Sequence, residues 1–293
     1  MKTFSWVKNR AVLSALCATP ILFSCAIAQA EETMAAPAAV VAAPAEPAPP
    51  YTLTYNLGIY SNYMFRGVDL SDGPALQGGV DFAHSSGFYL GTWFSNIDPY
   101  VNGRVDGVSD GNHLEVDLYG GYATTFANGL GLNFLGNYYW YPEGEDAAGT
   151  KNSPNSFEAS VALSYKWFTY TYYRVLTDYY GVNNINGRRG DTKGADYNEL
   201  KFNYKLPIAD LNLSAKVGYQ NTRHTNGDQG DIAIGINRDF SLTGAGTAIG
   251  GFNAGAVFTT TFDVEDEAFY LSTENKPRDT NEKKLTVYVK RSW

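Results

Sequence analysis

Apolar and polar residues alternate along most of the chain beyond residue 50. In the run Glu199–Leu206 every second residue is apolar or aromatic, and the intervening positions are charged or carry an amide. Side chains of a β-strand point alternately to opposite faces, so this pattern predicts a strand with one apolar and one polar face. The pattern returns over 211–221 after a short Pro-Ile-Ala-Asp segment. We therefore expect these two strands to pair as a hairpin.

Runs of this kind predict twelve strands in all. They lie near residues 52–65, 74–84, 87–96, 113–125, 130–141, 156–165, 167–176, 197–206, 211–221, 231–240, 248–262 and 284–293. Longer polar connections near 66–73, 97–112, 142–155, 177–196, 222–230 and 263–283 alternate with short ones near 85, 126, 166, 208 and 244. An even strand number, with long loops at one end and short turns at the other, is typical of a bacterial outer-membrane barrel. The prediction is an all-β fold, a twelve-stranded antiparallel transmembrane β-barrel whose two ends are periplasmic.

The pairing of the tenth and eleventh predicted strands stays open. The segment Thr243–Gly251 between them is rich in Gly and Ala, and such residues define the register of two strands poorly.

A soluble β-protein would alternate in the same way, with its apolar face packed in a core. The final segment Leu285–Trp293 favours the membrane barrel, because an alternating strand with a terminal aromatic residue resembles the signal read by the barrel-assembly machinery. We expect Trp293 to be part of this signal. Aromatic clusters such as Tyr138–Tyr141 also lie at strand ends beside long loops, where interfacial aromatic girdles belong.

The N-terminal fifty residues are expected to lie outside the barrel. Residues 1–30 have the layout of a signal peptide, with basic residues before an apolar stretch that ends in Ala28-Gln29-Ala30. Residues 31–50 consist mostly of Ala and Pro, which predicts a disordered periplasmic linker. The barrel then occupies residues 51–293.

Both cysteines, Cys17 and Cys25, lie within the predicted signal peptide. A lipoprotein cleavage site before Cys25 is an alternative, but the bulky Phe23 argues against it.

The charge balance is acidic. The chain has 22 Lys and Arg against 30 Asp and Glu, a formal net charge of −8, and loss of Lys2, Lys8 and Arg10 with the signal peptide would lower it by three. Such a balance argues against a nucleic-acid partner.

The segment Gly58–Asp81 reads GIYSNYMFRGVDLSDGPALQGGVD and resembles the opening of the TorF family of proteobacterial porins. Shorter matches are Gly87–Tyr89, Gly91–Trp93, Leu114–Tyr122 and Tyr139–Pro142. Together they span much of the predicted barrel. The resemblance implies an outer-membrane barrel that works as a porin.

Charged residues of the alternating strands are expected to face the lumen, because a basic side chain facing lipid at mid-membrane costs about 2–4 kcal/mol. The candidates to line a pore are Asp81, Glu115, Asp117, Glu158, Glu199, Lys201, Lys205, Lys216 and Lys290. Two interpretations stay open: an aqueous path with a mixed-charge constriction, and a salt-bridged interior that only fills a narrow barrel.

Three further residues are candidates for the pore mouth. Arg66 and Asp69 follow the first predicted strand, and Arg174 lies at the outer end of the seventh. A structural pairing that holds the first loop is the alternative role of Arg66 and Asp69. The alternation around Arg174 leaves its side of the strand undecided.

No enzyme is predicted. The chain has three His residues, and His113 has the lumen-facing parity of Glu115 instead of pointing toward lipid substrates. The acidic loops lack EF-hand spacing and no phosphate-binding glycine loop opens a helix, so no metal site and no cofactor are expected.

The predicted function is an outer-membrane, porin-like channel for passive diffusion of small hydrophilic solutes or ions. The alternative is a non-conducting structural or adhesive barrel whose long loops bind a ligand outside the cell. The expected partners are outer-membrane lipid, the barrel-assembly machinery and the solutes, and association into homo-oligomers stays open.

Overall fold

The computed structural model describes residues 49–99, 112–142, 154–181, 184–185, 188–189, 192–223, 226–244, 247–265, 279–281 and 283–293. The predicted signal peptide and all but the last two residues of the predicted linker lie outside these ranges, as do the centres of most predicted long loops. Within the described ranges, no helix is long and apolar enough to cross a membrane.

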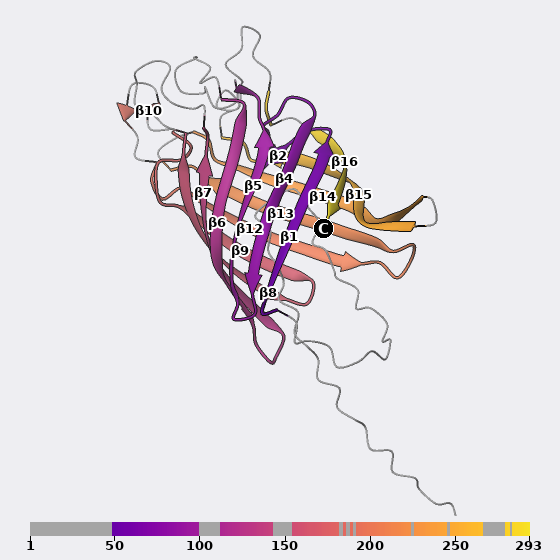
Figure 1. Ribbon diagram of the computed structural model, residues 1–293. Helices are drawn as coiled ribbons and strands as arrows, with labels where there is room; N and C mark the ends of the chain where they lie inside the picture. Colours follow the sequence, from indigo (N-terminus) through magenta and orange to yellow (C-terminus); the bar gives the residue numbers. More distant parts are fainter. Residues whose placement is uncertain are drawn as a thin grey trace, which may run out of the picture.

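Twelve antiparallel strands close into one barrel (Figure 1), which confirms the predicted fold. They are β1 Tyr51–Tyr60, β4 Ala75–His84, β5 Phe88–Asn96, β6 Leu114–Thr125, β7 Leu130–Trp140, β8 Ser156–Tyr165, β9 Phe168–Val175, β12 Asp196–Lys205, β13 Leu211–Asn221, β14 Gln229–Gly244, β15 Thr247–Phe262 and β16 Lys284–Ser292. Strands that follow one another in this series are neighbours in the barrel, and β1 pairs with β16 to close it.

The closing seam between β1 and β16 is short. Its register runs from Asn56 opposite Ser292 to Tyr60 opposite Tyr288. The rings of Tyr60 and Tyr288 stack on the inner side, with centroids 5.1 Å apart. Beyond the paired region, the backbones of Tyr55 and Trp293 exchange two hydrogen bonds of 3.1 and 2.9 Å. Closure in this way leaves neither terminal strand as a free sheet edge.

The two faces of the sheet differ in polarity as the alternation predicts. In β8, Phe157, Val161 and Leu163 point outward and are exposed, whereas Glu158 and Ser160 point inward and are buried. The other barrel strands repeat this arrangement, so large apolar side chains cover the outer surface and polar ones fill the inside. A water-soluble barrel would bury its apolar face, and the reverse distribution is typical of barrels that cross membranes.

The first strand is shorter than predicted. The expected strand over 52–65 ends at Tyr60, and residues 64 and 65 instead form β2 (Met64–Phe65), which pairs with β3 (Val68–Asp69). The expected long connection over 66–73 is present, but it starts at residue 61 and contains a hairpin that is buried. A similar small pair, β10 (Asn184–Ile185) and β11 (Arg188–Arg189), also stands apart from the barrel sheet.

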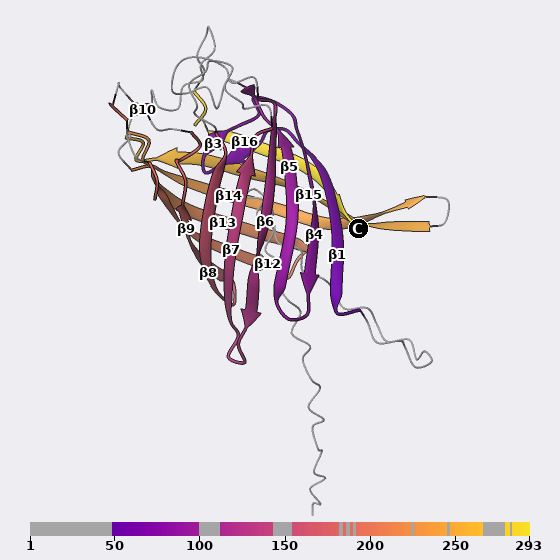
Figure 2. The ribbon, with the colours of Figure 1, turned by 60° about the vertical axis from the view of Figure 1, so that its left-hand side comes forward.

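Strands β14 and β15 extend past their neighbours as a two-stranded ribbon that projects from the barrel (Figure 2). The pairing of β13 with β14 reaches Arg238, and that of β16 with β15 begins at Phe252. From Gly230 opposite Phe262 to Phe240 opposite Phe252 the β14–β15 register is regular, and an irregularity follows. The register that the sequence left open is thus regular within the barrel and shifts only in the ribbon.

A charge placed on the outer surface should destabilise the barrel only where lipid surrounds it. Ile234 points outward in the middle of β14 and is 52% exposed, whereas Leu242, 50% exposed, lies in the projecting ribbon. We expect Ile234→Arg to lower the free energy of unfolding in phospholipid vesicles by about 2–4 kcal/mol. The matched control Leu242→Arg should change it by less than about 1 kcal/mol. Urea titration followed by tryptophan fluorescence measures both, and equal effects would contradict this placement.

Candidate functional site: the barrel lumen

The polar inner face of the strands surrounds the interior of the barrel, called the lumen below. The segment Ser61–Pro74, called the inner hairpin, leaves β1 where the long connections lie and folds into this space. Its residues Tyr63, Phe65 and Val68 are buried. Its side chains contact strands around the circumference, so the inner hairpin narrows the lumen at the end of the long connections.

Arg66, at the tip of the inner hairpin, contacts several strands of the barrel wall. Its Nη2 donates to both carboxylate oxygens of Glu158 in β8, at 2.8 and 2.9 Å, and its Nη1 donates to Oε1 of Gln220 in β13 at 2.9 Å. The guanidinium carbon lies 4.3 Å from the ring centroid of Tyr197 and 5.0 Å from that of Tyr173. Charge-assisted hydrogen bonds and cation–π contacts strengthen when water is excluded. Arg66, 2% exposed, therefore fastens the inner hairpin to the wall.

Two further contacts hold the inner hairpin on other sides of the barrel. The hydroxyl of Tyr63 donates to Oε1 of Glu115 in β6 at 2.7 Å. The carboxylate of Asp69 forms an ion pair with Lys284 in β16, with an Nζ–Oδ2 distance of 3.4 Å. The inner hairpin is thus tied to β6, β8, β13 and β16.

The turn of the inner hairpin has an unusual backbone. Phe65 and Val68 pair across a two-residue loop, and both residues of this loop, Arg66 and Gly67, have positive φ angles of 47° and 83°. Positive φ at both central positions is characteristic of the type I′ turn, which favours glycine. A Cβ atom on Gly67 would also lie 2.6 Å from Cγ2 of Thr261. Glycine is therefore required here both by the backbone and by the close approach of β15.

Carboxylates gather on one side of the lumen. The acidic wall, contributed by β4, β6 and β8, consists of Asp81, Glu115, Asp117 and Glu158. Tyr119 donates a hydrogen bond to Asp81, Tyr141 donates to Oε2 of Glu115 at 2.7 Å, and Asn137 donates to Oδ2 of Asp117 at 3.1 Å. Hydrogen bonds of this kind compensate part of the cost of taking a carboxylate out of water.

The opposite part of the strand order carries lysines beside carboxylates and is called the mixed wall. Its lysines, from β12, β13 and β16, are Lys201, Lys205, Lys216 and Lys290. Nζ of Lys201 lies 2.9 Å from Oε1 of Glu199, and Nζ of Lys216 lies 2.8 Å from Oδ2 of Asp231. Lys205 is the most exposed of the four and lies 3.8 Å from Asp210 in the adjoining short turn. The lumen therefore has an acidic side and a side with paired charges of both signs.

The structure places the predicted lumen candidates on the inner face of the strands, with Lys205 at the end of the short turns. Arg66 and Asp69 lie together in the inner hairpin and make the structural pairings that were the alternative to a mouth role. Arg174 differs from the pore-mouth expectation, because its neighbours Tyr173 and Val175 are buried inside and it shares the outer face with Tyr172.

The sequence did not single out Asp231, Gln220 and Tyr197 as site residues. Asp231 lies at the start of a predicted strand, and strand parity alone identifies it as inward. Nothing local marks Gln220 or Tyr197 as partners of Arg66, since 154 residues separate Gln220 from Arg66.

The described residues include no group of three or more His, Cys, Asp or Glu side chains arranged to hold a metal ion.

Several solved membrane barrels resemble this structure. The KdgM porin aligns with a TM-score of 0.46 and 7% sequence identity, covering 82% of this chain and 99% of the porin. The NanC porin aligns with a TM-score of 0.44 and 8% identity over 83% of this chain and 99% of that porin. A FadL homologue of Pseudomonas aeruginosa aligns with a TM-score of 0.39 and 11% sequence identity, covering 83% of this chain and 74% of the homologue. At these identities the likeness concerns the fold alone.

No curated protein matches the chain in sequence. A family model does match, over residues 44–293, which is the whole of the barrel together with the residues just before it. The chain therefore belongs to the Gcw_chp family, described as bacterial proteins of unknown function.

Proposed function

We propose that this protein is an outer-membrane channel through which small hydrophilic solutes or ions diffuse passively, with both ends of the barrel chain in the periplasm. The observation that carries the proposal is the charged inner face of a barrel whose outer face is apolar. Charges buried in a membrane protein are expensive and usually mark a path for water, ions or solutes. The resemblance of Gly58–Asp81 to the TorF porins supports the same function.

The distribution of charge supports selection by electrostatics. The acidic wall and the lysines of the mixed wall belong to different parts of the strand order, and the mixed wall also holds Glu199 and Asp231 as partners of its lysines. The paired charges cancel locally, and the acidic wall has fewer cationic partners. A lumen of this kind favours cations and orients dipolar solutes across the field between its walls.

A non-conducting barrel is the second candidate, and the burial of Arg66 favours it. The inner hairpin lies within the lumen and its tip is closed off from water by Tyr173, Tyr197 and Glu158. If no path remains beside this segment, the long connections are left as the surface for a ligand.

Conductance separates the two candidates. The full chain, refolded and inserted into planar bilayers in 1 M KCl (roughly the salt level at which surface charges are screened), should give reproducible single-channel steps smaller than those of an open barrel of equal strand number. Heat-modifiable mobility on gels provides the folding control. A folded barrel that shows no steps would rule out the channel and leave the ligand-binding barrel.

Release of the inner hairpin should widen the channel. Arg66→Gln leaves Glu158 buried without its cation, and breaking such a pair costs about 3–5 kcal/mol. We expect the hairpin to detach and single-channel conductance to rise roughly twofold or more. In the double variant Arg66→Gln with Glu158→Gln the two amides pair without charge, so conductance should return toward the unmodified value. Arg238→Gln, a charge change on the outer face and outside the hairpin contacts, is the control. Equal conductance in all variants would show that the hairpin does not limit flow.

Removal of a charge from the acidic wall and removal of a charge from the mixed wall should shift the ion selectivity in opposite directions. Asp81→Asn removes a negative charge from the acidic wall and should shift the reversal potential in a KCl gradient toward anions. Lys205→Gln removes a positive charge from the mixed wall and should shift it toward cations. Both positions are partly exposed, so neither change leaves a fully buried charge without its partner. Shifts of the same sign, or none, would contradict an electrostatic filter.

A further inference from the structure

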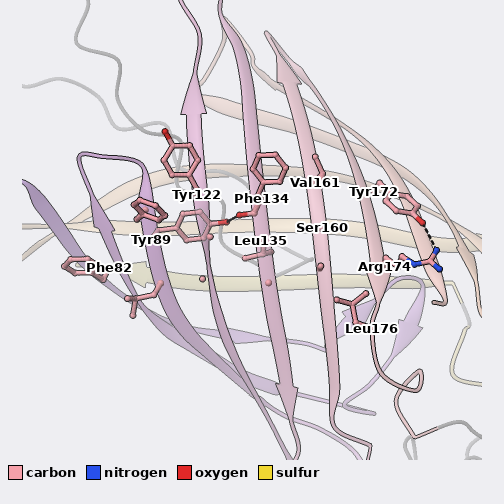
Figure 3. A pocket seen from close by; sticks show the side chains of 16 residues that line it. Phe82, Tyr89, Tyr122, Phe134, Leu135, Ser160, Val161, Tyr172, Arg174 and Leu176 are labelled. Atoms are coloured by element: carbon pink, nitrogen blue, oxygen red, sulfur yellow. Dashed lines mark hydrogen bonds between the residues drawn. The ribbon is translucent and has the colours of Figure 1, made fainter. Parts of the chain in front are cut away.

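A groove of about 780 Å³ runs over the outer surface of the barrel across β5 to β9 (Figure 3). Its floor is a row of cross-strand neighbours in which Leu90 pairs with Gly120, Gly120 with Gly136, and Gly136 with Ala159. The next residue of the row is Arg174, the partner of Ala159. Three small residues in succession leave a depression, because the neighbouring rows on the same strands carry large side chains.

One wall of the groove is the neighbouring row Phe88, Tyr122, Phe134, Val161 and Tyr172, whose members are also paired in succession. On the other side, Phe157 and Leu176 rise from β8 and the end of β9, and Cζ of Phe157 would lie 3.1 Å from a Cβ on Gly136. Neighbouring strands lie about 4.8 Å apart, so four strand spacings make the floor about 19 Å long. A groove of this length and lining can hold an extended hydrocarbon chain.

The groove runs obliquely across the strands, from near the short-turn end of β5 to near the long-connection end of β9. Leu90 is near the start of β5, beside the short turn after β4, whereas Arg174 is the last residue but one of β9, beside a long connection. With the short turns in the periplasm, the Arg174 end lies at the outer rim. Figure 3 shows Arg174 and Tyr172 at this end and Phe82 at the other.

A second arginine approaches this end of the groove. Gly194 lies between the two guanidinium groups, and a Cβ at Gly194 would be 2.7 Å from Nη2 of Arg174 and 2.7 Å from Nη1 of Arg223. The residue has a positive φ of 87° and no side chain, which lets both groups approach. Asp196, the cross-strand neighbour of Arg174, acts on it electrostatically. Asp196 is the one carboxylate of the described residues that is seen to act on Arg174, and it balances at most one of the two positive charges, so the rim attracts an anion.

We propose that the groove binds one acyl chain of a phosphorylated lipid of the outer leaflet, with the lipid phosphate held by Arg174 and Arg223. Arginine matches phosphate oxygens through paired hydrogen bonds. Tyr172, whose hydroxyl accepts a hydrogen bond of 3.2 Å from Nη1 of Arg174, orients the guanidinium at the groove end. The apolar floor leads from the phosphate site toward the middle of the bilayer, as an acyl chain does. The inference rests on the membrane placement proposed above and not on conduction.

Native mass spectrometry of the full chain in detergent micelles tests the proposal, with diphosphoryl lipid A as the probe. We expect one tightly bound lipid A per barrel. The double variant Arg174→Gln with Arg223→Gln should weaken its apparent affinity about tenfold or more, because charge-assisted hydrogen bonds are lost. The same double variant should lower the affinity for dephosphorylated lipid A only a little. Ala159→Phe fills the groove above its floor and should lower the affinity for both forms of lipid A. The smaller substitution Ala159→Leu repeats the test with less risk to folding.

Matched controls make the same chemical changes elsewhere on the outer surface. Ala256→Phe replaces an outward alanine between Ile236 and Val287, and Arg238→Gln removes an exposed arginine at the opposite end of the barrel. Both should bind lipid A as the unmodified barrel does. Heat-modifiable mobility verifies that each variant is folded, and channel conductance is measured separately.

Three results would overturn the proposal. Equal retention of lipid A by all folded variants would mean that only ordinary surrounding lipid is bound. Affinity for phosphatidylglycerol equal to that for lipid A would remove the assignment to the outer leaflet. A barrel dimer that Ala159→Phe dissociates would show that a second copy of the chain occupies the groove.

Discussion

The ion pair between Arg66 and Glu158 is the contact on which the shape of the lumen depends. Each partner is almost fully buried, at 2% and 3% of side-chain exposure, and a lone charge at either position would be strongly destabilising. The guanidinium of Arg66 therefore has to lie beside the carboxylate of Glu158. This fixes the position of the inner hairpin that carries Arg66. The strain of a positive φ at Arg66 is offset by the hydrogen bonds and ring contacts that its side chain makes here. A change to either partner consequently acts on the lumen as a whole.

Alternation explains why the barrel could be predicted from the sequence and the inner hairpin could not. A strand of ten residues repeats its two-residue period several times, so twelve strands and the inward parity of Glu115, Glu158 and Lys216 follow from the pattern. The pair β2 and β3 has two residues in each strand, too few to show a period. Its turn is Arg-Gly instead of the more usual Asn-Gly or Asp-Gly. The sequence therefore predicts one strand that runs on to residue 65 and a polar connection after it, and not a hairpin.

The same reasoning accounts for Arg174. The run Tyr170 to Arg174 has aromatic or polar residues at nearly every position, so neither parity is clearly the lipid-facing one. Strand pairing decides which face Arg174 occupies, because Arg174 lies opposite Ala159, one residue from the inward Glu158.

The partners of Arg66 could not be predicted from the sequence for a related reason. Glu158 and Gln220 come from distant strands, and only the closed register of the barrel brings them together.

The two faces of one strand connect the lumen with the outer groove. In β8, Glu158 anchors the inner hairpin while its neighbour Ala159 forms part of the groove floor. Successive residues of a strand point to opposite faces, so a shift of β8 by one position would exchange them and place a carboxylate on the apolar outer face. The register that pairs Gly136 with Ala159 therefore also fixes Asn137 opposite Glu158. A narrow, charged interior and a grooved, apolar exterior are thus consequences of the same set of backbone hydrogen bonds, and a change of register alters both faces together.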